Sequence, residues 1–203
     1  MSKKQTDRSQ IQSYQKVAIG HFEDIRDQLG GLMESVAAAD YEGQNALEFK
    51  TGCVDHATTF GADCVQALQQ IADLVSERSS AIARALGGDS ISINIGGLTA
   101  PARADIRSDV NVETADEAAL SGLHKTVGAH FTSIDGYFND HYLAFAKLGD
   151  PAIGGWLGPE FEQTREDLGT ATKKIQGMVT DNKATIQGYI NDQLVALGFT
   201  PAG

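Results

Sequence analysis

Four long stretches of this chain carry apolar residues at alternating steps of three and four, and this spacing limits its fold more than any other feature. The spacing places one apolar stripe along each of four α-helices. The predicted stripes run from Ile11 to Val36, from Phe49 to Leu86, from Leu120 to Leu148 and from Phe161 to Leu197. Such a helix is not stable alone in water, because its stability comes from burying the stripe. The sequence therefore predicts a mainly α protein in which two antiparallel helical hairpins form a four-helix bundle.

The ends of the predicted helices carry start and stop signals. Glycines follow the last turns of the second and fourth helices, at Gly87 and Gly198. Thr114 and Glu117 have the spacing of a capping box at the start of the third helix. Pro159 suits the first position of the fourth helix. These signals predict one hairpin over residues 1–89, a connector over 90–113 and a second hairpin over 114–203.

The connector has a different pattern from the rest of the chain. Residues 90–95 and 109–113 alternate between apolar and polar side chains, which predicts two short strands of a β-hairpin-like segment. Ile91, Ile93 and Ile95 share one face of the first strand. Because an isolated two-stranded hairpin is marginal in water, these isoleucines are predicted to rest on the bundle or on a neighbouring chain. They are the candidate residues for assembly.

Each hairpin has an elbow made of an aromatic residue, any residue and a glycine. The first elbow is Tyr41-Glu42-Gly43, and the second is Trp156-Leu157-Gly158. The glycine lets the backbone turn sharply, and the aromatic side chain closes the open end of the hairpin. The same unit occurs twice, about half a chain length apart, which indicates an internal repeat.

With these elbows between two amphipathic helices, each half of the chain resembles a WXG100 protein, a small helical hairpin of type VII (ESX) secretion systems. The second half carries the Trp-x-Gly motif at Trp156 and Gly158, and the first half keeps the glycine after Tyr41. The resemblance implies elbow residues Tyr41, Gly43, Trp156 and Gly158, and a partner hairpin that is fused in the same chain. The family's tail motif, a tyrosine followed four residues later by an acid, is not matched by Tyr189-Ile-Asn-Asp192.

Charge and composition narrow the possible partners. The 203-residue chain has a formal net charge of −11, so phosphate backbones repel it and a nucleic-acid partner is not expected. No apolar run is long enough for a transmembrane helix, and the polar N-terminus has no Sec-type apolar region. The expected partners are therefore proteins, either further copies in a homo-oligomer or components of the secretion machinery.

Two functions remain open at this point. The first is a non-enzymatic tandem WXG100-like protein, a type VII secretion substrate or export partner that is secreted without a Sec signal peptide. The second is a self-assembling structural subunit or membrane-active helical-bundle protein, which would use residues 90–113 for oligomerisation and could stay in the cytoplasm. No catalytic, cofactor or metal site is predicted, since the five histidines are scattered and none has the His-Glu-x-x-His spacing of a zinc helix.

Overall fold

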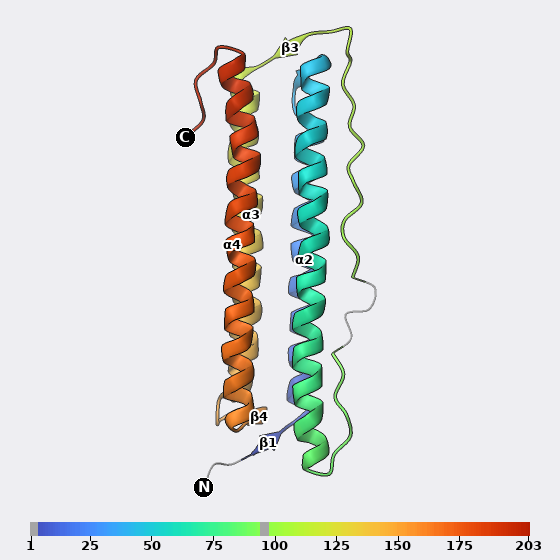
Figure 1. Ribbon diagram of the computed structural model, residues 1–203, viewed down its shortest axis with the longest axis vertical. Helices are drawn as coiled ribbons and strands as arrows, with labels where there is room; N and C mark the ends of the chain where they lie inside the picture. The colour runs from blue at the N-terminus through green and yellow to red at the C-terminus, as the bar shows by residue number, and fades with distance from the viewer. Residues whose placement is uncertain (1–3, 94–97) are drawn as a thin grey trace. The chain divides into compact units, whose positions relative to one another are not determined.

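The computed structural model describes residues 4–93 and 98–203, and over these residues the chain is mainly helical (Figure 1), as predicted. The long helices are α1 (Arg8–Ala37), α2 (Gln44–Ala85), α3 (Glu117–Ala146) and α4 (Pro159–Ala196). A 3-10 turn, η1 (Lys147–Gly149), follows α3. The strands are two residues each: β1 (Gln5–Thr6), β2 (Tyr41–Glu42), β3 (Thr114–Ala115) and β4 (Trp156–Leu157).

The short strands form two antiparallel pairs that join distant parts of the sequence. β1 pairs with β4, so that Thr6 lies opposite Trp156. β2 pairs with β3, so that Tyr41 lies opposite Ala115. Each pair therefore joins an elbow of one half to the residues that lead into the first helix of the other half.

The chain divides into two compact units, and each takes a segment from all four long helices. Unit 1 consists of Met1–Asp24, Cys64–Leu98 and Gly136–Gln176. Unit 2 consists of Ile25–Asp63, Thr99–Asp135 and Gly177–Gly203. The β1–β4 pair belongs to unit 1 and the β2–β3 pair to unit 2.

Several aromatic side chains pack together in the core of unit 1. The ring of Phe145 on α3 stacks on Phe161 of α4 at 5.3 Å between centroids. Tyr14 of α1 meets the same Phe145 ring edge-on at 5.5 Å. Arg78 of α2 forms an ion pair with Asp167 of α4 at 2.6 Å. Segments of all four helices therefore contact one another within this unit.

Unit 2 has a similar packing arrangement with different residues. Phe60 of α2 contacts Phe131 of α3, with 5.7 Å between ring centroids. Gln28 of α1 lies 2.9 Å from the His130 ring nitrogen on α3. α4 joins through Gln187, whose amide donates to a backbone oxygen of α3 at 3.1 Å. The contacts again involve segments of all four helices.

The apolar stripes predicted from the sequence are buried at most of their positions, and the differences have physical causes. Leu86 and Leu197 are exposed, because they lie just beyond the last residues of α2 and α4. On α4 two polar side chains are buried within the stripe, Thr172 and the fully buried Thr164. The Thr164 hydroxyl donates to the backbone oxygen of Glu160 at 2.6 Å, so this buried polar group is hydrogen-bonded. The spacing of apolar residues does not predict a buried threonine.

The predicted ends of α2 and α4 are confirmed by left-handed glycines. Gly87 has φ +82°, and the N–H of the next residue bonds the oxygen of Ala83 at 2.8 Å. Gly198 has φ +79°, and the N–H that follows it bonds the oxygen of Leu194 at 2.8 Å. Both patterns are Schellman motifs, in which glycine avoids the steric cost of the left-handed region.

The predicted capping box at Thr114 and Glu117 is wrong. Asp116 caps α3, because its carboxylate accepts the N–H of Ala119 at 2.7 Å. Thr114 belongs to β3, so its backbone is engaged with Glu42. Asp7 caps α1 in the same way and accepts the N–H of Ser9 at 2.9 Å.

The two strands predicted in the connector are not formed by its described residues. Residues 109–113 form a turn, in which the carboxylate of Asp109 accepts the N–H of Asn111 at 2.9 Å. Residues 90–93 have the predicted alternation of burial but pair with no strand. Their backbone bonds instead to serine side chains of α2, at Ser76 and Ser80.

Candidate functional site

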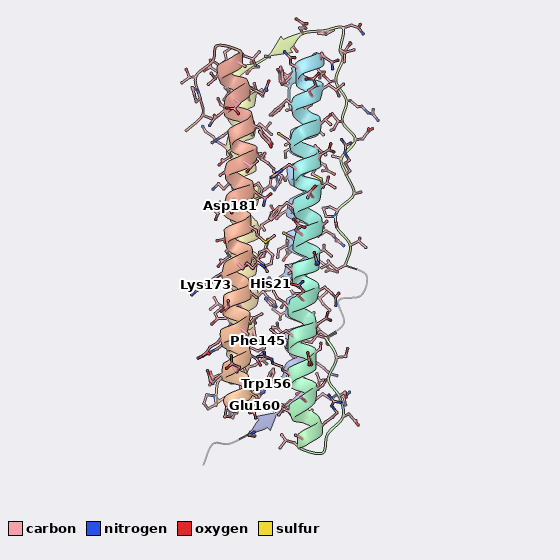
Figure 2. The ribbon with its side chains drawn as sticks, viewed as in Figure 1. His21, Phe145, Trp156, Glu160, Lys173 and Asp181 are labelled. Atoms are coloured by element: carbon pink, nitrogen blue, oxygen red, sulfur yellow. The ribbon has the colours of Figure 1, made fainter. Side chains whose placement is uncertain are left out.

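The two elbows are the sites that the sequence singles out, and the second one is the more deeply buried. Trp156 is fully buried in unit 1 and lies near Phe145 (Figure 2). Its ring meets those of Phe145 and Phe161 edge-on, at 6.0 and 5.8 Å between ring centroids. Such aromatic contacts add to the stabilisation from burying the indole. The indole Nε1 has no hydrogen-bond partner among the described residues.

Glycines shape the approach to the second elbow. A Cβ on Gly149 would lie 2.0 Å from the Phe161 ring, so only glycine fits at the end of η1. Gly158 has φ +130°, a conformation that other residues rarely adopt. α4 begins at the next residue, Pro159, which confirms the predicted start of that helix.

The N-terminal segment binds to this elbow through backbone and side-chain contacts. The N–H of Asp7 donates to the oxygen of Gly155 at 2.6 Å, and the Gln5 amide donates to Gly154 O, also at 2.6 Å. Lys4 forms an ion pair with Glu160 in the first turn of α4. This ion pair lowers the pKa of the Glu160 carboxyl. The strand pair β1–β4 is therefore one part of a larger contact.

The first elbow, in unit 2, has the same backbone plan. Tyr41 is 3% exposed, and its hydroxyl donates to Gln193 at 3.1 Å. Burial raises the pKa of this phenol. The hydroxyl of Tyr41 is therefore hydrogen-bonded to another residue of unit 2. Gly43 has φ +115°, and α2 begins at the next residue.

Glu42 connects the first elbow to the connector, a role that sequence reasoning missed. Its carboxylate accepts the Ser108 hydroxyl at 2.8 Å and the N–H of Asp109 at 2.7 Å. The buried Lys50 ammonium lies 3.8 Å from it and also donates to Arg107 O at 3.4 Å. The Ser108 bond, the Asp109 bond and the charge of Lys50 lower the pKa of Glu42. The only sequence feature that pointed to the burial of Lys50 was its position next to the apolar stripe.

The two elbows are thus closed reciprocally. β1 leads into the first hairpin and pairs with the second elbow, whereas β3 leads into the second hairpin and pairs with the first elbow. Each elbow consists of a two-residue strand, a glycine with positive φ and the start of a helix. The elbow residues Tyr41, Gly43, Trp156 and Gly158 therefore occupy equivalent positions in two different units.

Two of the three candidate assembly residues, Ile91 and Ile93, lie against α2. Ile91 and Ile93 are each 5% exposed within unit 1, and their N–H groups bond to α2. Ile95 lies outside the described residues. The role of these three isoleucines in assembly stays a prediction.

A buried histidine–tyrosine pair is the most perturbed titratable group in unit 1. The Tyr14 hydroxyl lies 2.7 Å from His141 Nε2, and the other ring nitrogen of His141 has no partner among the described residues. Burial among Tyr14 and Phe22, together with the nearby charge of His21, lowers the pKa of His141 to about 3. The sequence placed His141 on α3 but gave no signal that it would be fully buried.

Neither a metal-binding cluster nor a membrane-spanning helix occurs among the described residues. No three of their His, Cys, Asp and Glu side chains come close enough together to hold a metal ion. None of the described helices combines the length and the apolar character that crossing a membrane requires. No family model, curated protein or solved structure matches the chain.

We predict that Trp156→Ala lowers the free energy of unfolding by about 3–5 kcal/mol, because it leaves a large cavity beside the stacked rings of Phe145 and Phe161. Tyr41→Phe should cost about 1 kcal/mol, since it leaves Gln193 without the hydroxyl donor. Val195→Ala is a suitable control, because Val195 is 58% exposed and its loss should change stability by less than about 0.5 kcal/mol. Urea unfolding followed by circular dichroism measures all three; equal effects of Trp156→Ala and Val195→Ala would contradict the burial argument.

A second prediction concerns pH. His141 is expected to have a pKa near 6.5 when unfolded and about 3 when folded, so the unfolded chain binds the extra proton between these values. Its contribution to stability is therefore complete above pH 6.5 and is lost as the pH falls toward 3, at up to about 1.4 kcal/mol per pH unit. His141→Gln, which keeps a hydrogen-bonding group near Tyr14, should flatten the dependence of unfolding free energy on pH. Val195→Ala, which changes no titratable group and lies at an exposed position, is the control and should leave the slope unchanged.

Proposed function

We propose that the chain is a tandem WXG100-like protein in which the two hairpins are partners of each other and together form one antiparallel four-helix bundle. In this proposal it has no catalytic role and acts through protein–protein contacts, as a type VII secretion substrate or export partner. It leaves the cell without a Sec signal peptide. No cofactor is assigned.

One observation carries this proposal: each hairpin supplies the strand that closes the other hairpin's elbow. A hairpin taken alone would keep its elbow glycine and aromatic residue but lose the paired strand and the contacts around it. Such an elbow would leave backbone N–H and C=O groups without protein partners. With both hairpins in one chain, each supplies the partners for the elbow backbone groups of the other.

The packing within each unit supports the same proposal. Helix segments from both halves contact one another in unit 1, through Tyr14 and Phe145, and in unit 2, through Phe60 and Phe131. The apolar stripe of each hairpin is therefore covered partly by residues of the other hairpin. Burial of apolar area is the main favourable contribution to such an association.

The alternative function, self-assembly into a homo-oligomer through residues 90–113, has one specific observation in its favour. Val110 and Val112 are 48% and 45% exposed, on either side of Asn111 in the turn that replaces the predicted strand. Two exposed valines so close together form a small apolar surface that a second copy could cover. Light scattering measures the particle mass of the parent chain and of the double variant Val110→Ser with Val112→Ser. Oligomers of the parent chain that are lost in the double variant would favour self-assembly, and a monomeric parent chain would contradict it.

Mutual closure predicts the result of cutting the connector. A protease site placed between Thr99 and Ala100 would divide the chain into its two hairpins. After cleavage the fragments should elute together from a size-exclusion column, and each fragment purified alone should be largely unfolded or aggregated. Circular dichroism of the separate and recombined fragments measures this. Two fragments that fold stably alone and do not bind each other would show that the hairpins are independent.

Export is tested in a bacterium that carries a type VII secretion system and in an isogenic strain that lacks it. An epitope-tagged chain is expected in the culture supernatant of the first strain only, with a cytosolic marker protein as the control for lysis. Trp156→Ala should reduce the exported amount if the closed elbow is what the system recognises. Equal amounts outside both strains would overturn the assignment to this secretion route.

A further inference from the structure

The connector segment Ile91–Ile93 is held by a regular set of hydrogen bonds from α2, in unit 1. The N–H of Ile91 donates to Ser80 Oγ at 2.8 Å, and the Ser80 hydroxyl donates back to the Ile91 oxygen. The N–H of Ile93 donates to Ser76 Oγ at 2.7 Å, and the Ser76 hydroxyl donates back to the Ile93 oxygen at 3.4 Å. Each serine therefore binds both backbone groups of one isoleucine.

The geometry of a helix explains why two serines can do this. Ser76 and Ser80 are four residues apart, which corresponds to about 6 Å along the axis of α2. Two residues of extended chain cover about 6.6 Å, so Ile91 and Ile93 match the spacing of the serines. The segment runs antiparallel to α2, since the later serine binds the earlier isoleucine. A helix face thus replaces the neighbouring strand that an extended segment would otherwise need.

The side chains of the segment complete the pattern. Ile91 and Ile93 are buried, while Ser92 between them is exposed. Hydrogen bonds hold the backbone at two positions, and two aliphatic side chains are buried. The described contacts do not restrict the side chain of the residue between them. This is the chemistry of β-strand recognition, in which backbone bonds give affinity and alternate side chains give specificity.

We propose that Ser76, Ser80 and the surface that covers Ile91 and Ile93 form a binding site for an extended peptide segment with two aliphatic side chains two residues apart. In this chain the site is filled by its own residues 91–93, so a partner segment binds by displacing them. The segment seated there defines what fits, through its own backbone bonds and buried side chains. The inference does not rest on the proposed export function.

The segment that already fills the site lowers the expected affinity of the unmodified protein for a free peptide. A segment in the same chain competes at a high effective concentration, so the unmodified protein should bind a free peptide weakly. Ile91→Ser with Ile93→Ser removes the two buried side chains of the competitor and leaves both α2 serines in place. This released variant is the form in which binding to a free peptide is measured.

The test uses the fluorescently labelled peptide GDSISI, which has the sequence of residues 88–93. Fluorescence anisotropy should show that the released variant binds it at least about tenfold more tightly than the unmodified chain. Adding Ser76→Ala and Ser80→Ala should weaken binding by about tenfold or more, since four hydrogen bonds are lost. Ser79→Ala is the matched control, because Ser79 bonds to Ser76 O within α2 and has no described bond to the connector; it should change binding less than about twofold.

A chemical control separates backbone recognition from simple apolar adhesion. A GDSISI peptide that is N-methylated at both isoleucines keeps its side chains but lacks the two N–H donors, and it should fail to bind. Equal binding of the methylated peptide, or equal binding by the Ser76→Ala and Ser80→Ala variant, would overturn the proposal. So would a released variant with native helicity that binds no peptide at millimolar concentration.

If the double isoleucine change reduces helicity, the single change Ile93→Ala serves in its place, with the same expected order of affinities. Hydrogen exchange of the unmodified chain provides a second measurement. The amides of Ile91 and Ile93 should exchange more slowly than that of Ser92, and excess unlabelled GDSISI should accelerate their exchange by displacing the segment. Unchanged exchange at saturating peptide, together with no binding by the Ile93→Ala variant, would overturn the proposal.

Discussion

The structure depends on one constraint: a helical hairpin leaves backbone groups at its elbow that it cannot satisfy by itself. In this chain the second elbow is completed by Gln5–Thr6 and the first by Thr114–Ala115. The two elbow glycines, Gly43 and Gly158, adopt the positive φ that turns the chain away from its strand and into the next helix. Mutual closure also explains why both aspartates that follow these strands, Asp7 and Asp116, cap the helices that begin there.

Polar groups inside the apolar stripes show a second consequence of long amphipathic helices. Thr164 is satisfied by the backbone of its own helix, and Lys50 by Glu42 and a connector oxygen. His141 is hydrogen-bonded only to Tyr14 among the described residues, and its burial keeps it neutral to low pH. A buried polar group with a single partner makes the stability of its surroundings sensitive to protonation. The core of unit 1 therefore contains a titratable group whose protonation would lower the stability of the unit.

The connector shows that a sequence with alternating apolar and polar residues need not form a β-strand. The alternation of Ile91, Ser92 and Ile93 correctly predicts which side chains are buried, but it does not identify the partner of the backbone. That partner is a pair of serines on α2. A serine within a predicted helix does not indicate that an extended segment will bind to it. At residues 109–113 the carboxylate of Asp109 stabilises a turn, so the same alternation leaves Val110 and Val112 exposed.

The sequence by itself determined the helices, most of their buried stripes, their glycine ends and the two elbows, because these follow from local spacing and backbone preference. Tertiary structure alone decided that Asp116 and not Thr114 caps α3, since Thr114 is used in a strand pair with a residue far away in the sequence. It also decided that Tyr41 donates to Gln193 and that Lys50 and His141 are buried. These contacts join residues that are distant along the chain, and a local pattern contains no information about which distant residue will lie opposite.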